Sequence, residues 1–158
     1  MVLLSLVFSL SIYALGAYIL SGLGLVFLIL YIGYCIFIEF NLMRRSCVHC
    51  YYYGKVCGLG RGKLCSIFFK KGDPETFLRN DITWLSLVPD FMVFIFPLIG
   101  GIFLLIRDFS LVLLSLLFVL LILSMAGNAV IRSAYACKYC KQKELGCPAE
   151  KLFGTEKK

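Results

Sequence analysis

Charged residues are scarce in this chain. Only 16% of its residues carry a charge, and the first 42 residues contain a single ionisable side chain, Glu39. By contrast, 61% of the residues are hydrophobic and the mean hydropathy is +0.91. Soluble domains are nearer about 45–50% apolar, and a chain of 158 residues is too small to bury so large an excess. The composition excludes a disordered chain and an ordinary cytosolic enzyme, and it predicts an integral membrane protein.

Histidine is the rarest of the residues that bind metals or transfer protons. His49 is the only one in the chain, which excludes bis-histidine haem and histidine-rich metal sites. No pairing of a nucleophile with a general base is recognisable, so a non-enzymatic function is favoured. Basic residues are also lacking after Met1, and the apolar run continues well past Ala14–Ala17. Both features argue against a cleaved signal peptide.

The apolar residues form two long blocks. A membrane-spanning helix needs about 20 residues, so the first block accommodates two helices, at roughly 2–20 and 24–42. The second block gives a third span from Ile82 to Ile106 and a fourth from about 110 to 131. We therefore predict an all-α integral membrane protein with four transmembrane helices in two hairpins. Its segments are hairpin 1 at 1–42, a loop at 43–81, hairpin 2 at 82–131 and a tail at 132–158.

The basic residues predict the orientation of the hairpins. With two hairpins, the N-terminus, the loop and the tail share one side of the membrane, and 15 of the 16 basic residues belong to that side. Because loops rich in Lys and Arg stay in the cytoplasm, we expect a multi-pass protein with both termini and both cysteine-rich segments cytoplasmic. The net charge of +7 also predicts contact with anionic lipid headgroups of the bilayer.

A cysteine pattern, C-x2-C-x6-C, occurs twice, each time after the second helix of a hairpin. Its members are Cys47, Cys50 and Cys57 in the loop and Cys137, Cys140 and Cys147 in the tail. Both hairpins enter the membrane from the same side. The two halves would therefore form a parallel internal repeat, related by an axis along the membrane normal.

The cysteines outside the spans predict a metal-binding cap. The cytosol keeps thiols reduced, which disfavours structural disulfides, and free cysteines are usually buried apolar residues, whereas these lie in polar segments. Two C-x2-C pairs supply the four thiolates of a tetrahedral zinc site. We expect zinc as the cofactor, with candidate ligands Cys47, Cys50, Cys57, Cys65, Cys137, Cys140 and Cys147 and with His49 as a candidate additional ligand.

Two arrangements of these ligands are open. The two C-x2-C pairs can form one site shared by the two halves, which leaves the other three cysteines, with His49, for a second site. Alternatively, the four loop cysteines form a local site and the three tail cysteines need an outside ligand. An iron–sulfur cluster is the alternative cofactor, since all-cysteine ligation suits it equally well. A redox-active dithiol is less favoured, because both pairs follow helix C-termini, where the dipole opposes a thiolate.

Two further features of the loop have competing interpretations. The glycine run at 58–62 could form an anion-binding nest, but tight turns between metal ligands explain it better, and the P-loop pattern is not met because Leu64 follows Lys63. Tyr51–Tyr53 could stack on bases, yet aromatic belts are usual at membrane interfaces. We therefore do not expect nucleic acid as a partner, and we expect a protein partner or a second copy of the chain instead.

Asp90 is the candidate functional acid of the membrane region, because ionisable groups there are functional candidates by default. If the third span starts near Ile82, Asp90 lies about two turns deep. We favour the alternative, in which residues 75–88 form an interfacial helix anchored by Trp84 and Asp90 caps a shorter span that begins at Phe91. The fourth span offers too few polar side chains to indicate an ion path, namely Ser115, Ser124 and Asn128.

Three functions follow, in this order of preference. The first is a non-enzymatic membrane scaffold or partner-binding protein with a cysteine-ligated structural zinc module. The second is a membrane-bound redox protein that carries an iron–sulfur centre. The third is a small transporter or channel, which would depend on Asp90 and on oligomerisation.

Overall fold

The computed structural model describes residues 2–58, 60–74, 84–127, 130 and 141, and this part of the chain is helical with no strand. The helices are α1 (Val2–Ser21), α2 (Leu25–Leu42), α3 (Arg61–Phe68), α5 (Trp84–Arg107) and α6 (Leu111–Ile122). A π-helical turn follows two of them, η1 (Met43–Cys47) after α2 and η2 (Leu123–Gly127) after α6. The prediction of an all-α protein is confirmed for these residues.

Three helical segments are long and apolar enough to cross a membrane, namely Leu3–Ser21, Leu25–Cys47 and Leu87–Arg107. They correspond to the three spans expected from hydropathy, and the second continues to Cys47 rather than ending at residue 42. The fourth apolar helix is shorter within the described residues, from Leu111 to Gly127. This described part of the helix is shorter than the length of about 20 residues that a span needs.

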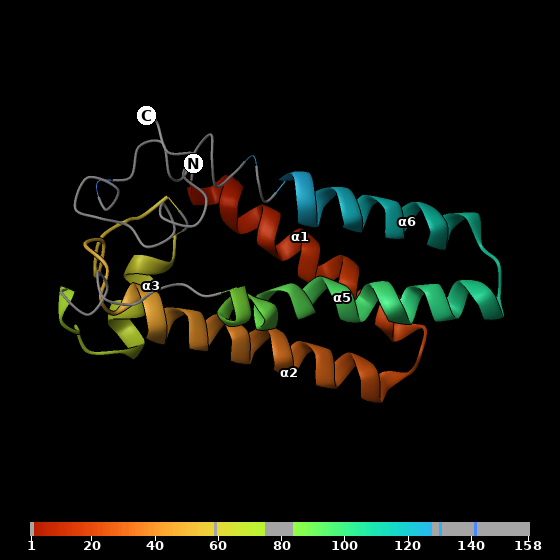
Figure 1. Ribbon diagram of the computed structural model, residues 1–158, viewed down its shortest axis with the longest axis horizontal. Helices are drawn as coiled ribbons and strands as arrows, with labels where there is room; N and C mark the ends of the chain where they lie inside the picture. The colour runs from red at the N-terminus through yellow and green to blue at the C-terminus, as the bar shows by residue number, and fades with distance from the viewer. Residues whose placement is uncertain (1, 59, 75–83, 128–129, 131–140, 142–158) are drawn as a thin grey trace.

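The helices form a bundle in which α1 and α5 lie at the centre, with α2 on one flank and α6 on the other (Figure 1). The N-terminus of α1 lies at one end of this bundle, and so does α3. The fourth apolar helix runs toward the same end and finishes in η2. The turns that join α1 to α2 and α5 to α6 lie at the opposite end. The start of α1 and the described part of the loop therefore share one end of the bundle.

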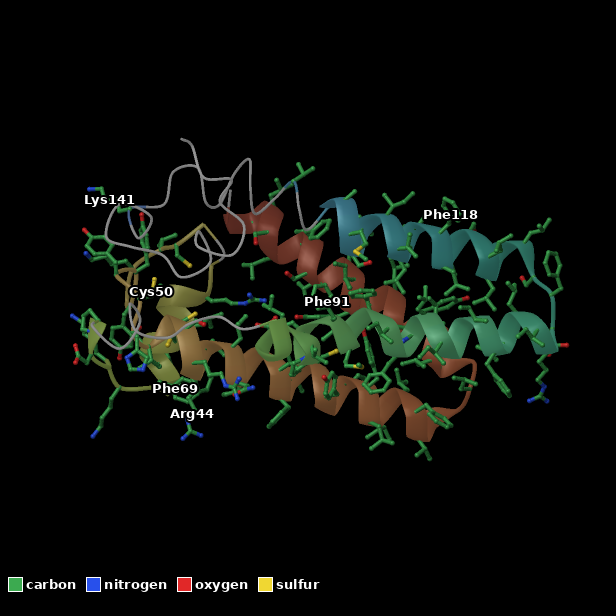
Figure 2. The ribbon with its side chains drawn as sticks, in the orientation of Figure 1. Arg44, Cys50, Phe69, Phe91, Phe118 and Lys141 are labelled. Carbon is green, nitrogen blue, oxygen red and sulfur yellow. The ribbon has the colours of Figure 1, made fainter. Side chains whose placement is uncertain are left out.

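Close packing at the centre depends on small residues of α5. A Cβ atom at Gly101 would press on Leu117 and Ile19, and one at Gly100 would press on the side chain of Leu20. These glycines let α5 approach its neighbours closely. The core is enclosed as a result, and Ile19 is only 1% exposed. Small residues at helix contacts are usual in membrane bundles. The outer faces are lined by exposed apolar side chains, among them Phe118 on α6, which points away from the bundle (Figure 2).

Asp90 lies inside α5, which continues from Trp84 through Pro89 to Arg107. The expectation that Asp90 caps a span beginning at Phe91 is therefore wrong. The hydroxyl of Tyr34 on α2 donates a hydrogen bond of 2.8 Å to the carbonyl of Pro89, and this bond joins α2 to α5 next to Asp90.

Residues 43–74, which we call the cap, fold against the end of α2. Gly72 donates a backbone hydrogen bond to Val48, and Gly54 donates one to Gly62. A Cβ atom at Gly62 would collide with the carbonyl oxygens of Tyr52 and Lys55, so only glycine fits there. The ring of Phe40 on α2 meets the ring of Phe68 on α3, with centroids 5.3 Å apart. These contacts fix α3 at the end of the bundle.

Candidate functional site

Polar side chains follow one face of α1 at a spacing of four residues: Ser5, Ser9 and Tyr13. Residues four apart lie on the same side of a helix. Ser5 is 6% exposed, so this stripe faces the interior of the bundle.

A second stripe with the same spacing runs along α2 and consists of Tyr31, Cys35 and Glu39. Tyr31 and Cys35 are buried, in one cluster with Leu20 and Val93. Cys35 is therefore a packing residue of the bundle. The stripe ends at Glu39, one turn before the end of α2 that adjoins the cap.

Glu39 is the point at which three helices meet. The hydroxyl of Tyr13 on α1 donates a hydrogen bond to its Oε1 atom, and Nη2 of Arg61 on α3 forms a hydrogen-bonded ion pair with the same oxygen. The Arg61 side chain is 14% exposed and that of Glu39 is 24% exposed, so the ion pair is largely removed from solvent. A residue of the cap thus neutralises an acid within a membrane-spanning helix.

The charge of Arg61 is maintained in this position. Burial disfavours the guanidinium, but the carboxylate of Glu39 and the hydrogen bond to it outweigh burial and hold the pKa of Arg61 above its ordinary value. Since a charge in such surroundings is tolerated only when it is paired and hydrogen-bonded, Glu39 and Arg61 depend on each other.

The ion pair forms part of the wall of a cavity of about 100 Å³ between α1, α2, α5 and the cap. Asp90 of α5 lies in the same wall and is half-buried. The structure therefore brings the candidate acid Asp90 to the same cavity as Glu39 and Arg61. The cavity is also lined by the hydroxyl-bearing residues Ser5, Ser9, Tyr13 and Ser124.

The loop cysteines gather above this cavity, around η1 and α3. Burial, together with the nearby thiols of Cys65, Cys57 and Cys50, raises the pKa of Cys47 to about 12. The Cys57 sulfur accepts a hydrogen bond of 3.4 Å from the backbone N–H of Gly62. Cys65 is fully buried and its thiol donates to the Met43 carbonyl at 3.7 Å, and burial raises the pKa of this thiol.

These side chains do not form a ready metal-binding group. Within the described ranges, no three His, Cys, Asp or Glu side chains are placed so that they could hold a metal ion. Nδ1 of His49 lies 2.8 Å from the carbonyl oxygen of Asp73, so this candidate additional ligand contacts the cap backbone. Cys137, Cys140 and Cys147 lie outside the described residues, so the second copy of the C-x2-C-x6-C pattern is not described.

One residue of the tail reaches the cap. The backbone N–H of Lys141 donates a hydrogen bond of 3.2 Å to the hydroxyl of Tyr52, and Figure 2 shows Lys141 at the same end of the molecule as Cys50. The chain therefore returns to the cap after the fourth helix.

Sequence reasoning missed several residues of the cavity. The spacing of Ser5, Ser9 and Tyr13, with the matching spacing that ends at Glu39, is a signal that could have predicted two facing polar stripes. Arg61 had no such signal, because it lies 22 residues from Glu39 in the sequence and reaches it only through the fold of the cap.

No family model, no curated protein and no solved structure matches this chain.

Proposed function

We propose that this protein is a non-enzymatic, multi-pass membrane scaffold whose cap is stabilised by a cysteine-bound zinc ion. The observation that carries the proposal is the grouping of Cys50, Cys57 and Cys65 around Cys47 in a cap that is tied to the bundle. Rotation of these side chains toward a common centre would supply the four thiolates of a structural zinc site. The N–H of Gly62 at the Cys57 sulfur suits a thiolate, because thiolates accept hydrogen bonds.

The grouping favours the local arrangement over the shared one. A site shared by the two halves would require the ends of the second and fourth helices to meet near the axis between the hairpins. Instead α2 and α6 lie on opposite flanks of the central pair (Figure 1). The three tail cysteines then serve a separate site, for which a partner protein would supply the missing ligand.

The arrangement of the helices supports four spans in a parallel repeat. Each first helix of a hairpin, α1 or α5, packs against both helices of the other hairpin. A two-fold axis along the bundle would produce this equivalence. Under this proposal the fourth helix continues beyond Gly127 to complete a span.

The placement of charge supports a cytoplasmic cap. The basic residues of the cap belong to the end of the bundle where α1 starts, whereas Arg107 lies at the other end. Positively charged segments remain in the cytoplasm, and there they would contact anionic headgroups or an acidic partner protein. The exposed basic side chains of the cap are Arg44, Arg45, Lys55, Lys63, Lys70 and Lys71.

Metal analysis of anaerobically purified protein tests the proposal. We expect a colourless protein that contains zinc, and we expect Cys50→Ser to lose that zinc while Cys140→Ser retains it. Cys35→Ser is the matched control, since Cys35 packs inside the bundle. If Cys140→Ser lost the same equivalent of zinc as Cys50→Ser, the site shared by the two halves would be the better arrangement. A brown protein with iron would favour the redox function, and a protein without metal would contradict both.

Labelling tests the orientation. After metal removal, an impermeant maleimide should modify Cys57 only in permeabilised cells. Modification from outside intact cells would reverse the topology and make disulfides the better interpretation of the cysteines.

A further inference from the structure

The outer side of α3 carries an exposed apolar stripe, which consists of Leu64, Ile67 and Phe68. Ile67 and Phe68 follow Leu64 by three and four residues, so all three lie on one face of the helix. Ile67 is 69% exposed and the other two are also exposed, whereas Cys65 on the inner side is fully buried. A contiguous exposed apolar face outside a span marks contact with a membrane or with another protein.

The contact of Phe68 with α2 shows the depth of this stripe. Its ring meets the ring of Phe40 edge to face, with centroids 5.3 Å apart. Phe40 belongs to the apolar segment Leu25–Cys47 and is exposed on the outside of α2. Arg44 follows Phe40 by one turn on the same face and is exposed, a position from which a long basic side chain reaches the headgroups. Figure 2 shows Arg44 and Phe69 at this end of α2. The stripe therefore begins beside the last apolar turn of a span.

Three lysines flank the stripe. Lys63 lies within α3, Lys70 and Lys71 follow it, and all three are exposed. An apolar face bordered by lysines is typical of a helix that lies in the membrane interface, where its apolar side chains reach the acyl chains and its lysines meet anionic headgroups. A soluble protein would have to reach the stripe past the lipid that surrounds Phe40. The position therefore favours the bilayer as the occupant.

We propose that α3 is an in-plane membrane anchor, whose apolar stripe inserts into the leaflet beside α2 and whose flanking lysines bind the phosphate groups of anionic phospholipids. The pairing of Arg61, in the first turn of α3, with Glu39 on α2 holds the helix against the span. This inference rests on the proposed membrane spans and deepens the proposed contact with headgroups, because it names the segment that enters the leaflet. It depends neither on zinc nor on the side of the membrane that the cap faces.

Fluorescence quenching by brominated lipids tests the insertion. The chain has a single tryptophan, which Trp84→Phe removes. In that background, Ile67→Trp places a fluorophore on the stripe, and Ser66→Trp places one on another side of α3, beside Gly54. In nanodiscs that hold one chain each, lipids brominated near the headgroup end of their acyl chains should quench Ile67→Trp at least twofold more than Ser66→Trp. Aqueous iodide should quench the two variants in the opposite order.

Amide exchange tests the preference for anionic lipid. Exchange in α3 should be several-fold slower in nanodiscs of phosphatidylcholine with phosphatidylserine than in phosphatidylcholine alone, and high salt should reduce the difference. The combined variant Lys63→Gln, Lys70→Gln and Lys71→Gln should lose most of it. Arg107→Gln is the matched control, since Arg107 is exposed at the opposite end of the bundle, and it should keep the full difference.

Three results would overturn the proposal. The first is strong iodide quenching of Ile67→Trp without quenching by lipid, which would place the stripe in water. The second is shielding from iodide only in nanodiscs that hold two chains, which would assign the stripe to a second copy. The third is equal exchange of α3 in both lipids. If Ile67→Trp does not fold, Leu64→Trp provides the same test. Zinc content and maleimide labelling of Cys57 are independent of these measurements, so this inference and the proposed function fail separately.

Discussion

The hydroxyl of Tyr31 on α2 donates a hydrogen bond of 2.9 Å to the carbonyl oxygen of Val93 on α5. Pro97 follows Val93 by four residues inside the same helix. Because proline has no N–H, this carbonyl lacks its usual partner within the helix. In a bilayer such a group must be satisfied by a neighbouring element, and Tyr31 satisfies it. The bond therefore joins the two hairpins where proline interrupts the helix.

Tyr31→Phe should destabilise the bundle by about 1 kcal/mol, since it leaves the Val93 carbonyl unsatisfied. Pro97→Ala restores an N–H to α5, so in that background Tyr31→Phe should cost clearly less. Unfolding of all four proteins in mixed micelles measures this cycle. Tyr18→Phe is the control, because Tyr18 is 65% exposed. An equal cost of Tyr31→Phe in both backgrounds would contradict the role assigned to Pro97.

Gly16→Ala should also destabilise the bundle, by about 1–3 kcal/mol. A Cβ atom at this position would collide with the ring and hydroxyl of Tyr31, which must then move away from Val93. Gly33→Ala is the matched control, since no atom lies within 4 Å of the Cβ position there, and alanine should be neutral or stabilising in a helix. If both variants unfold alike, the contact with Tyr31 is unimportant.

Glu39→Gln and Arg61→Gln should each loosen the cap, because each leaves the other charge without its partner. Loss of one partner from a buried pair costs about 3 kcal/mol, and the double variant should cost less than the two single variants together. Faster amide exchange across residues 43–74 is the readout. Asp108→Asn should have no measurable effect there, since its pair with Arg107 is exposed. Additive effects of the two substitutions would show that the pair does not anchor the cap.

High pH should weaken the metal-free cap through Cys65. Burial raises the pKa of this thiol, so the folded state keeps its proton while the unfolded chain loses it. The resulting stabilisation is complete below the ordinary thiol pKa of about 8.5 and is lost as the pH rises through the raised value. In metal-free protein with the native sequence, amide exchange of the cap should therefore accelerate across this range by more than the general effect of pH on exchange. In Cys65→Ala, the dependence on pH should be weaker.

Hydropathy was sufficient to predict α1, α2 and α5, because a span must be apolar along its whole length and little else in a sequence has that property. Gly24, in the turn between the first two helices, has a φ of 127°, a conformation that favours glycine. The error over Asp90 arose because Pro89 reads as the start of a helix, whereas α5 runs through it from Trp84 to Arg107.

The cavity was harder to predict than the helices. Asp90 was identified from its depth in the apolar run, but its neighbours come from other helices and from the cap. Arg61 was counted only as one of the basic residues that set the topology. Its pairing with Glu39 depends on the turns of the cap and on the close fit of Gly62 against neighbouring carbonyls, and such tertiary contacts leave no periodic pattern in a sequence.

The π-helical turn η1 has a consequence for changes in chain length. Within it the N–H of Val48 bonds to the carbonyl of Met43, five residues earlier, so the turn holds one residue more than an α-helix would. One residue corresponds to a rotation of about 100° around the helix axis. Removal of one residue there can be absorbed because the wide turn closes to an ordinary α-helical turn, whereas insertion of one residue would rotate the cap by about 100° around α2 and carry Arg61 away from Glu39. The junction between α2 and the cap can therefore lose a residue more easily than it can gain one.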